Sequence, residues 1–313
     1  MTTKAVAQPD KGRKKYKFTM YHRYAYLFIA PFFIAFITFN LYPTLYTILL
    51  SFTDLKGWAT EFNFVGLENY KNIIQNPFFT KSVGNTFILW TVNFIPQIIL
   101  AFFLAYTFTS RRLNMRGTEF FKTVFYLPNI ITAASIAVLY SALFSYPQGP
   151  INLFLQDIGL LEKPFDFFRS VPATRLIVSY IQFWMWYGQT TIIIVAAILS
   201  IDESLIEAAR VDGANDWKIF RHITLPLMKP ITLYILITSM IGGLQMFDIP
   251  LLLTNGQPDN SVETMMTFIY KQAFTGGRSM NVAATASVML LIISIILSIL
   301  VYRVLRDRTE KGS

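Results

Sequence analysis

Residues 207–230 read EAARVDGANDWKIFRHITLPLMKP, a polar segment between two long apolar runs. Ala208 and Ala209 are strong helix formers with almost no side chain, so a helix through Leu205–Val211 would present a surface that another protein can approach closely. Gly213 then allows the chain to turn. The segment therefore predicts a short helix followed by a turn.

The residues after this turn predict a second short helix. An apolar side chain recurs there at every third position, at Trp217, Phe220 and Ile223. Pro226 is expected to end this helix, and Pro230 to open the next apolar run. An amphipathic helix that lies in the headgroup layer of a membrane needs only the same apolar stripe and basic flanks, so that alternative stays open.

The composition places the chain in a lipid bilayer. Hydrophobic residues make up 54% of the 313 positions, charged residues only 14%, and the mean hydropathy is +0.46. A helix that crosses the hydrocarbon needs about 20 apolar residues. The apolar runs predict an all-α membrane protein with six transmembrane helices, at about 24–53, 82–110, 121–145, 174–201, 230–252 and 279–302.

The distribution of basic residues predicts the orientation of these spans. If the N-terminus is cytosolic, 19 of the 27 lysines and arginines lie on the cytosolic side and 8 on the other. This asymmetry follows the positive-inside rule, and an even number of spans then places both termini in the cytosol. Membrane orientation thus accounts for the net charge of +9, and we do not expect nucleic acid as a partner. We expect cytosolic tails at 1–20 and 306–313, and a transmembrane domain at 21–305.

Three further short helices are expected in the loops between the spans. The segment FVGLENYKNI, Phe64–Ile73, has the composition of a short helix, and so has Ile151–Gly159 within a turn-rich loop. A third short helix is expected after the Gly, Asn and Pro residues of the loop Thr254–Asn260.

The segment 207–230 resembles the EAA loop of the permease subunits of ABC importers, because every fixed position of that pattern is filled. In that family the loop is a cytoplasmic coupling helix seated in a groove of a cytosolic ATPase, within the type I ABC importer permease fold. The resemblance implies a coupling loop at 203–230. Its docked helix and turn would comprise Glu207, Ala208, Ala209, Asp212, Gly213 and Ala214. The residues that pack it against the membrane body would be Phe220, Ile223, Leu225 and Pro226.

Similarity to the permeases of carbohydrate importers extends from Ala30 to Phe274. It is carried by Pro43–Asp54, FVGLENY, Tyr126–Pro128, GPINLFL and Leu253–Gly256. The resemblance implies a bacterial or archaeal cell membrane, and a complex with a second, non-identical permease, two ATP-binding subunits and an extracellular solute-binding protein. It also implies import of a carbohydrate such as an oligosaccharide, with glycerol phosphate or another polar solute as the alternative.

Polar side chains within the predicted spans are candidates for the solute pathway. Such groups are costly in a bilayer unless they face protein or water, and sugars bind to aromatic rings, amides and carboxylates. The candidates are Asn93, Gln97, Gln182, Trp186, Tyr187, Gln189, Gln245 and Asp248. Bridging between helices and anchoring in the headgroup layer remain alternatives for these side chains.

The sequence predicts a protein that is not an enzyme. A P-loop requires Gly-Lys-Ser/Thr, and no glycine of this chain is followed by lysine, so ATP hydrolysis is expected on separate subunits. We expect neither a cofactor nor a metal in this chain. An ion-coupled secondary transporter would carry ion ligands at mid-membrane and often internal repeats, and neither is evident. An intramembrane enzyme would need clustered acids and bases, yet His22 and His222 both lie in basic segments.

Overall fold

The computed structural model describes the chain except for residues 1–20, 58, 60, 111–114, 276–277 and 311–313. The predicted tail at 1–20 therefore lies outside the described residues. Apart from one isolated bridge between Thr53 and Phe64, the regular structure of the described residues is helical. The chain divides into two units, Met1–Thr47 and Ile48–Ser313, which are described separately below.

The first unit contains a helix with a wide turn in its middle. Helix α1 (Tyr21–Phe36) is followed by a π-helical turn, η1 (Ile37–Leu41), and by α2 (Tyr42–Leu50), which continues into the second unit. The wide turn is visible as a hydrogen bond from the Tyr42 N–H to the carbonyl of Ile37, five residues back. Pro43 follows directly and has no N–H to donate, which favours an irregular turn at this point.

The second unit contains long helices and short connecting helices. The long ones are α4 (Pro77–Thr109), α5 (Thr118–Ile130), α6 (Ala133–Leu143), α8 (Val171–Leu199), α12 (Lys229–Leu244) and α15 (Met280–Glu310). The short ones are α3 (Glu68–Ile74), α7 (Pro150–Asp157), η2 (Phe167–Arg169), α9 (Glu203–Val211), α10 (Asp216–Ile219), η3 (Phe220–Thr224), α11 (Leu225–Leu227), α13 (Asp248–Thr254) and α14 (Met265–Phe274). The predicted short helices near 64–73, near 151–159 and after 254–260 are thereby confirmed as α3, α7 and α14.

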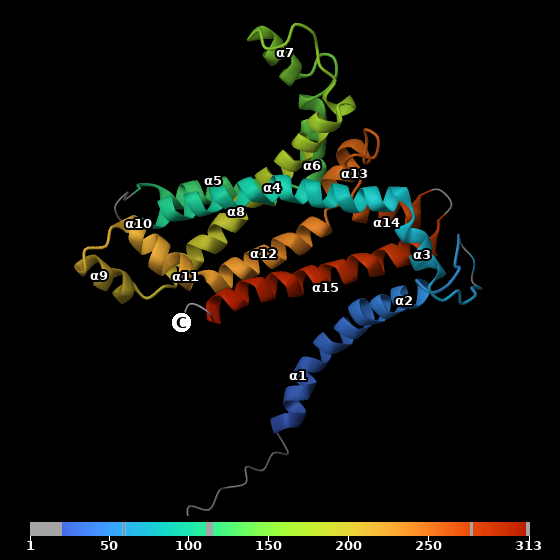
Figure 1. The fold of residues 1–313 in the computed structure, drawn as a ribbon, viewed down its shortest axis with the longest axis horizontal. Helices are drawn as coiled ribbons and strands as arrows, with labels where there is room; N and C mark the ends of the chain where they lie inside the picture. Colours follow the sequence, from blue (N-terminus) through green and yellow to red (C-terminus); the bar gives the residue numbers. More distant parts are fainter. Residues whose placement is uncertain (1–20, 58, 60, 111–114, 276–277, 311–313) are drawn as a thin grey trace, which may run out of the picture. The chain divides into compact units, whose positions relative to one another are not determined.

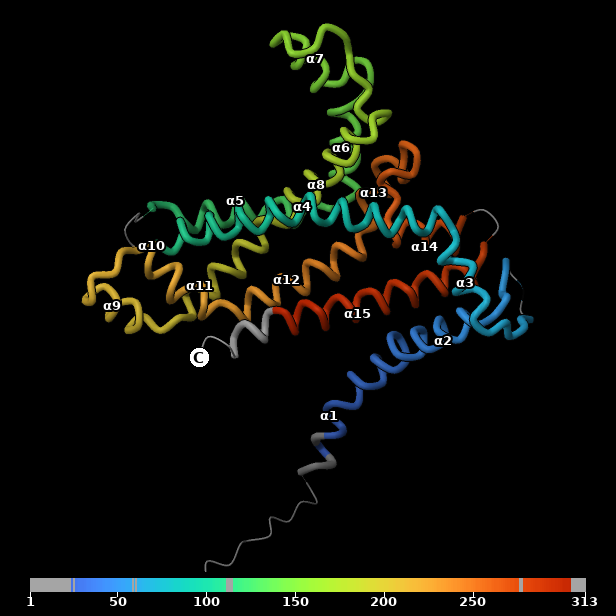
Figure 2. The backbone as a smooth tube through the Cα atoms, viewed as in Figure 1, coloured from blue at the N-terminus to red at the C-terminus, as the bar shows by residue number. Residues whose placement is uncertain are grey.

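The described residues include five helices or helix pairs that are long and apolar enough to cross a membrane. The pair α5 and α6 brings this number to six if it counts as one span, but its two halves are bent by 89°. Figure 2 shows α6 turning away from the direction of α5. The all-α class with its set of membrane-crossing helices is therefore as predicted, whereas the run 121–145 is not one continuous helix.

The bend between α5 and α6 has a local cause in the sequence. Ile131 and Thr132 adopt extended backbone angles after Pro128, the third residue from the end of α5. The Thr132 hydroxyl accepts a hydrogen bond from the N–H of Ser135 at 3.3 Å. In a continuous helix that N–H would donate to the carbonyl of Ile131, so the threonine cap stabilises a new helix start instead.

Helix α12 lies at the centre of the second unit. It packs against α4, α8 and α15 (Figure 1), and α4 packs along α8. Ala101 and Ala105 of α4 are completely buried in a cluster with Ile194 and Val195 of α8. Small residues let helix backbones approach closely, which matters in lipid because dispersion contacts replace the hydrophobic effect as the driving force between helices.

The two ends of this unit differ in structure. Helices α9 and α10 lie at one end, near the start of α5, while α3 and α14 lie at the other (Figure 1). Helices α6 and α7 project together from the packed helices. The loop after α7 is tied to it by the buried Asn152, whose amide donates to the carbonyl of Phe165 at 3.1 Å and accepts from its N–H at 2.8 Å.

Gly188 sets the distance between α5 and α8. A Cβ atom added at this position would overlap the carbonyl oxygen of Phe125 in α5. We expect Gly188→Ala to lower the stability of the protein by about 1 to 3 kcal/mol, because the clash is with backbone and the helices must move apart. The measurement is the thermal unfolding midpoint of the purified protein in detergent.

Gly84→Ala in α4 is the matched control for this substitution. A Cβ atom at Gly84 meets nothing within 4 Å. Alanine is the better helix former by about 1 kcal/mol, so this variant is expected to unfold at the same temperature or slightly above it. Equal midpoints for the two variants would contradict the assignment of Gly188 as a close-packing contact.

Candidate functional site

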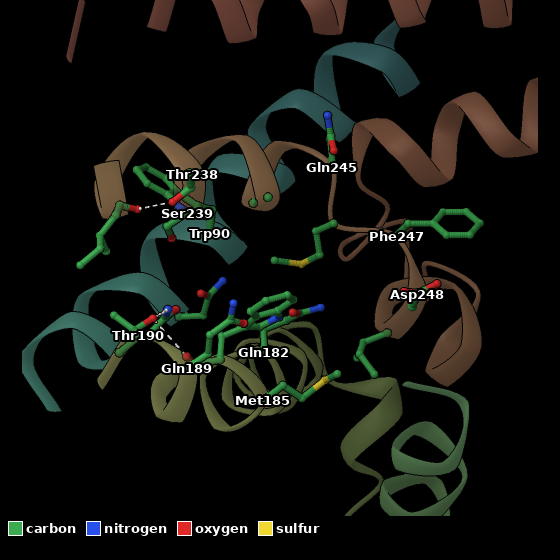
Figure 3. A pocket seen from close by; sticks show the side chains of 18 of the residues that line it. Trp90, Gln182, Met185, Gln189, Thr190, Thr238, Ser239, Gln245, Phe247 and Asp248 are labelled. Atoms are coloured by element: carbon green, nitrogen blue, oxygen red, sulfur yellow. Dashed lines mark hydrogen bonds between the residues drawn. The ribbon is translucent and has the colours of Figure 1, made fainter. Parts of the chain in front are cut away.

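A cavity of about 300 Å³ lies between α4, α8 and α12, where α12 ends and α13 begins (Figure 3). Seven of the eight residues predicted for the solute pathway line it: Asn93, Gln97, Gln182, Trp186, Gln189, Gln245 and Asp248. Further polar or aromatic lining residues, which the sequence analysis did not single out, are Trp90, Thr190, Tyr234, Thr238 and Ser239. The structure therefore brings polar groups from three spans together at one place.

A break in the helical backbone forms one wall of this cavity. The run 230–252 is not continuous, because residues Gln245 to Phe247 between α12 and α13 are not helical. The carbonyl of Met246, a buried residue within this break, accepts a hydrogen bond of 2.6 Å from the hydroxyl of Thr264, which satisfies it within the protein. In Figure 3 the Gln245 side chain extends away from Gln182.

Gly243 allows a second close approach at the cavity. A Cβ atom at this position would overlap the indole ring of Trp90. The Trp90 ring also stacks on Phe94, with ring centroids 5.3 Å apart and planes inclined by 18°. The glycine thus admits a large aromatic side chain of α4 against the last turn of α12, and this ring becomes part of the cavity wall.

One of the buried amides holds two helices together, and another is paired within its own helix. The Gln97 amide donates a hydrogen bond of 2.8 Å to the Thr190 hydroxyl, joining α4 to α8, and the Asn93 amide donates one of 2.8 Å to the Leu89 carbonyl. The bridging alternative is therefore met for Gln97, whereas the hydrogen bond of Asn93 stays within α4. Gln182 and Gln189 have no hydrogen-bond partner within the described part of the chain, so their amides are available to a ligand.

Tyr187 is the predicted pathway residue that does not line the cavity. Its buried ring lies 5.5 Å from that of Phe183 and 6.0 Å from that of Phe125 in α5. The cavity face of α8 instead carries residues at helical spacing: Gln182, Trp186, Gln189, Thr190 and Ile193. This spacing of three and four could have separated Tyr187 from its neighbours and identified Thr190.

The helix predicted at Leu205–Val211 is present as α9. The Asp202 carboxylate caps it by accepting a hydrogen bond of 3.0 Å from the Ser204 N–H. This backbone hydrogen bond lowers the pKa of the Asp202 carboxyl below its usual value. The cap is therefore present above the ordinary aspartate pKa, and it is lost as the pH falls through the lowered one.

The turn after α9 has the hydrogen bonds of a Schellman motif. The Ala214 N–H donates to the Ala209 carbonyl at 2.9 Å, and the Gly213 N–H to the Arg210 carbonyl at 3.0 Å. Gly213 has φ +80°, in the left-handed region that favours glycine. An ion pair of 3.6 Å between Arg210 and Asp216 closes the turn on its other side.

The second predicted helix is present in three continuous pieces, α10, η3 and α11. The Asn215 side chain accepts a hydrogen bond of 2.8 Å from the Lys218 N–H and so begins α10. The Phe220 ring lies 5.2 Å from that of Tyr106 in α4, which fits the expectation that it packs against the membrane body. The helix ends at Leu227, one residue after Pro226, and Met228 forms a turn before α12 begins.

The other predicted coupling residues differ in exposure. Glu207, Ala208, Asp212, Gly213, Leu225 and Pro226 are exposed in this chain, whereas Ala209, Ala214 and Ile223 are half-buried. Two apolar side chains beside them are also open: Val211 is 88% exposed and Trp217 61%. The segment from α9 to α10 therefore leaves apolar side chains uncovered beside charged ones of both signs, since Arg210 and Lys218 are exposed as well.

Comparison with known proteins identifies the family. The model of the family described as binding-protein-dependent transport system inner membrane component matches residues 75–311, which include both the cavity and α9–α11. The lactose transport system permease protein LacF of Rhizobium radiobacter is 31% identical over 285 residues, covering 90% of this chain and 94% of the relative. The arabinooligosaccharides transport system permease protein AraP of Bacillus subtilis is 31% identical over 281 residues, covering 88% and 86%.

The fold also matches solved structures. Two structures of a bacterial ABC transporter for the acidic polysaccharide alginate align with a TM-score of 0.77 and 24% identity, over 92% of this chain and 96% of theirs. One of them is in complex with an alginate pentasaccharide-bound periplasmic protein. The helices and the polar cavity define a multi-pass membrane transport component. The chain belongs to the family of inner membrane components of binding-protein-dependent transport systems, which are ABC importer permeases and not themselves catalytic.

The hydrogen bond between Gln97 and Thr190 gives a stability test of the cavity wall. We expect Thr190→Val to destabilise the protein by about 1 kcal/mol, because the Gln97 amide stays buried without its acceptor. In the double variant Gln97→Leu, Thr190→Val that penalty is absent, so it is expected to unfold closer to the wild-type temperature than Thr190→Val alone. A double variant that is less stable than either single variant would contradict this assignment.

Proposed function

We propose that this chain is one of two non-identical permease subunits that together form the membrane pathway for a carbohydrate, such as an oligosaccharide. An extracellular solute-binding protein delivers the solute, and two ATP-binding subunits drive the transport. The chain itself holds no cofactor. Both of its termini lie in the cytosol, on the side where most of its lysines and arginines are found.

The cavity between α4, α8 and α12 is the observation that carries this proposal. It combines the indole rings of Trp90 and Trp186 with the unpaired amides of Gln182 and Gln189. Aromatic faces with a few hydrogen-bonding groups suit a sugar, whose rings have apolar faces and polar edges. The lactose and arabinooligosaccharide systems named for the relatives support the same solute class.

The exposed face of α9 and its turn supports the proposed coupling to an ATPase. Glu207 offers a carboxylate to a cation of a partner, while Ala208 leaves room for a close approach of its backbone. Val211 and Trp217 add apolar area that water would otherwise cover. The same segment connects α8 to α12, and both of these helices line the cavity.

An ion-coupled secondary transporter is the main alternative to an ATP-driven importer. Such a transporter needs ligands for its coupling ion at the depth of the membrane. Within the described part of the chain, no group of three or more histidine, aspartate or glutamate side chains could hold a metal ion. The alternatives are separated by the energy source: uptake that survives the loss of ATP but collapses with an ion gradient would favour the secondary transporter.

The coupling role is tested by Gly213→Val and Glu207→Lys. We expect uptake to fall at least about tenfold in both variants while ATP hydrolysis by the complex continues, because the first strains the left-handed turn and the second reverses the charge presented to the ATPase. ATP hydrolysis and solute uptake are to be measured together in proteoliposomes with the binding protein present.

Gly117→Val is the matched control for the coupling test. Gly117 is also exposed and left-handed, with φ +78°, and lies at the start of α5 at the same end of the unit as α9. The same strain at this position is expected to leave hydrolysis coupled to uptake. Normal coupled transport by both Gly213→Val and Glu207→Lys would contradict the proposed role of α9.

The pathway role is tested by Gln182→Ala and Gln189→Ala. Each removes an amide that has no other partner in the described part of the chain, so the half-saturating solute concentration is expected to rise about fivefold per lost hydrogen bond. Tyr187→Phe is the control, because its ring packs against Phe125 and Phe183 outside the cavity. Equal uptake by the two alanine variants and the wild type would place the pathway elsewhere.

A further inference from the structure

We propose that the cavity excludes anionic solutes and that Asp248 is the residue that determines this charge selectivity. The solute is then an uncharged, polyhydroxylated molecule. This inference rests on the proposed function, in which the cavity is part of the solute pathway, and it narrows the class of solute that can pass.

The only charge in the cavity wall of the described residues is negative. Among the described residues that line the cavity, Asp248 is the only one with a charged side chain, and none is a lysine, arginine or histidine. The Asp248 side chain is exposed and has no ion pair or hydrogen bond within the described part of the chain. Figure 3 places it on the side of α13, opposite Thr190 and Gln189.

Two cations near the cavity, Arg175 and Lys271, are occupied by partners of their own. Arg175 of α8 donates from Nε to the carbonyl of Ser261 at 3.0 Å and from its terminal nitrogen to the side-chain oxygen of Asn85 at 2.7 Å. Lys271 of α14 forms an ion pair of 2.6 Å with Glu263. Neither side chain lines the cavity. Both cations therefore stabilise the protein around the cavity and do not offer their charge to a solute.

The uncharged groups of the wall fit a neutral solute. The amides of Gln182 and Gln189 add donors and acceptors without adding charge. A sugar hydroxyl can both donate to and accept from these two amides, so it leaves neither of them unpaired.

Entry of an anionic solute into this cavity would be unfavourable. A phosphate or a uronate loses part of its hydration on entering, and without a cation in the wall this loss is not offset. The Asp248 carboxylate adds repulsion between like charges. Proteins that recognise such anions use arginine or lysine for the purpose. Glycerol phosphate, which the sequence left open, is therefore a poor fit, as is an acidic polysaccharide like the alginate of the structurally similar transporter.

The absence of cysteine from the sequence permits a direct measurement of this selectivity. Single cysteines are introduced at Gln189 or Thr238, on two different walls of the cavity, in the full complex in permeabilised membranes. Each is reacted with an anionic, a neutral and a cationic methanethiosulfonate reagent of similar size. Labelling rates on this chain are followed by mass spectrometry at low ionic strength, where screening is weak. Val211→Cys, on the exposed face of α9, is the control position.

We expect the cationic reagent to react fastest and the anionic one slowest at both cavity positions. In the Asp248→Asn background the ratio of cationic to anionic rates is expected to fall on the order of threefold, and Asp248→Lys is expected to reverse the order. The ratio at Val211→Cys is expected to be the same in all three backgrounds. Cavity ratios that do not change with the residue at 248, or anionic labelling as fast as cationic labelling in the wild type, would overturn the proposal.

Uptake measurements separate a failure of this inference from a failure of the proposed function. The probes are radiolabelled maltotriose and trigalacturonate, a neutral and an anionic trisaccharide, tested on proteoliposomes with and without ATP. Uptake of trigalacturonate that depends on ATP would leave the importer role intact and overturn the charge selectivity. Uptake of either probe that needs no ATP would overturn the importer role, whatever the labelling rates show about Asp248.

Discussion

Every backbone N–H and C=O group within a bilayer must find a partner inside the protein, and the rest of this structure depends on that constraint. Helices satisfy it along nearly the whole of the long apolar runs. The two runs that break, between α5 and α6 and between α12 and α13, need other partners. The Thr132 hydroxyl accepts from the Ser135 N–H at the first break, and the Thr264 hydroxyl donates to the Met246 carbonyl at the second.

Both breaks adjoin the same cavity. Ala133, the first residue of α6, belongs to its wall, and so do Gln245, Met246 and Phe247 of the second break. Irregular backbone at membrane depth is tolerated where it is buried in protein or lines a cavity. The position of both breaks beside this polar cavity agrees with that rule. The interruptions of these helices therefore adjoin a polar cavity, and the amides of Gln182 and Gln189 line it without partners in the described part of the chain.

The sequence predicted the helices correctly where a long run of apolar residues defines them. It did not predict the breaks, because each of these depends on a few particular contacts. Apolar runs predict the helices because length and composition suffice, and Ala208, Ala209 and Gly213 predict α9 and its turn because propensity and backbone freedom are local properties. The break between α5 and α6 was missed because a single side chain decides it: Thr132 starts a new helix by accepting from the Ser135 N–H. The break between α12 and α13 was missed because Thr264, which pairs with the Met246 carbonyl, lies 18 residues further along the chain. Tyr187 was assigned to the pathway because its neighbours in the sequence are polar. Its position on helix α8, however, directs its side chain toward Phe125 of α5.

The position of α12 connects the two candidate sites. Its first turn follows directly on η3 and α11, where Phe220 contacts Tyr106 of α4, and its last turn holds Gly243 against Trp90 of the same helix. A rigid helix transmits a displacement along its axis with little loss, since its hydrogen bonds resist extension. A force applied to α9 by a partner would therefore reach the cavity through α12 and α8 together. The Gly243–Trp90 contact joins α12 to α4, and the Phe220–Tyr106 contact joins η3 to the same helix, so such a force would change the cavity by moving these helices past one another, without unfolding either.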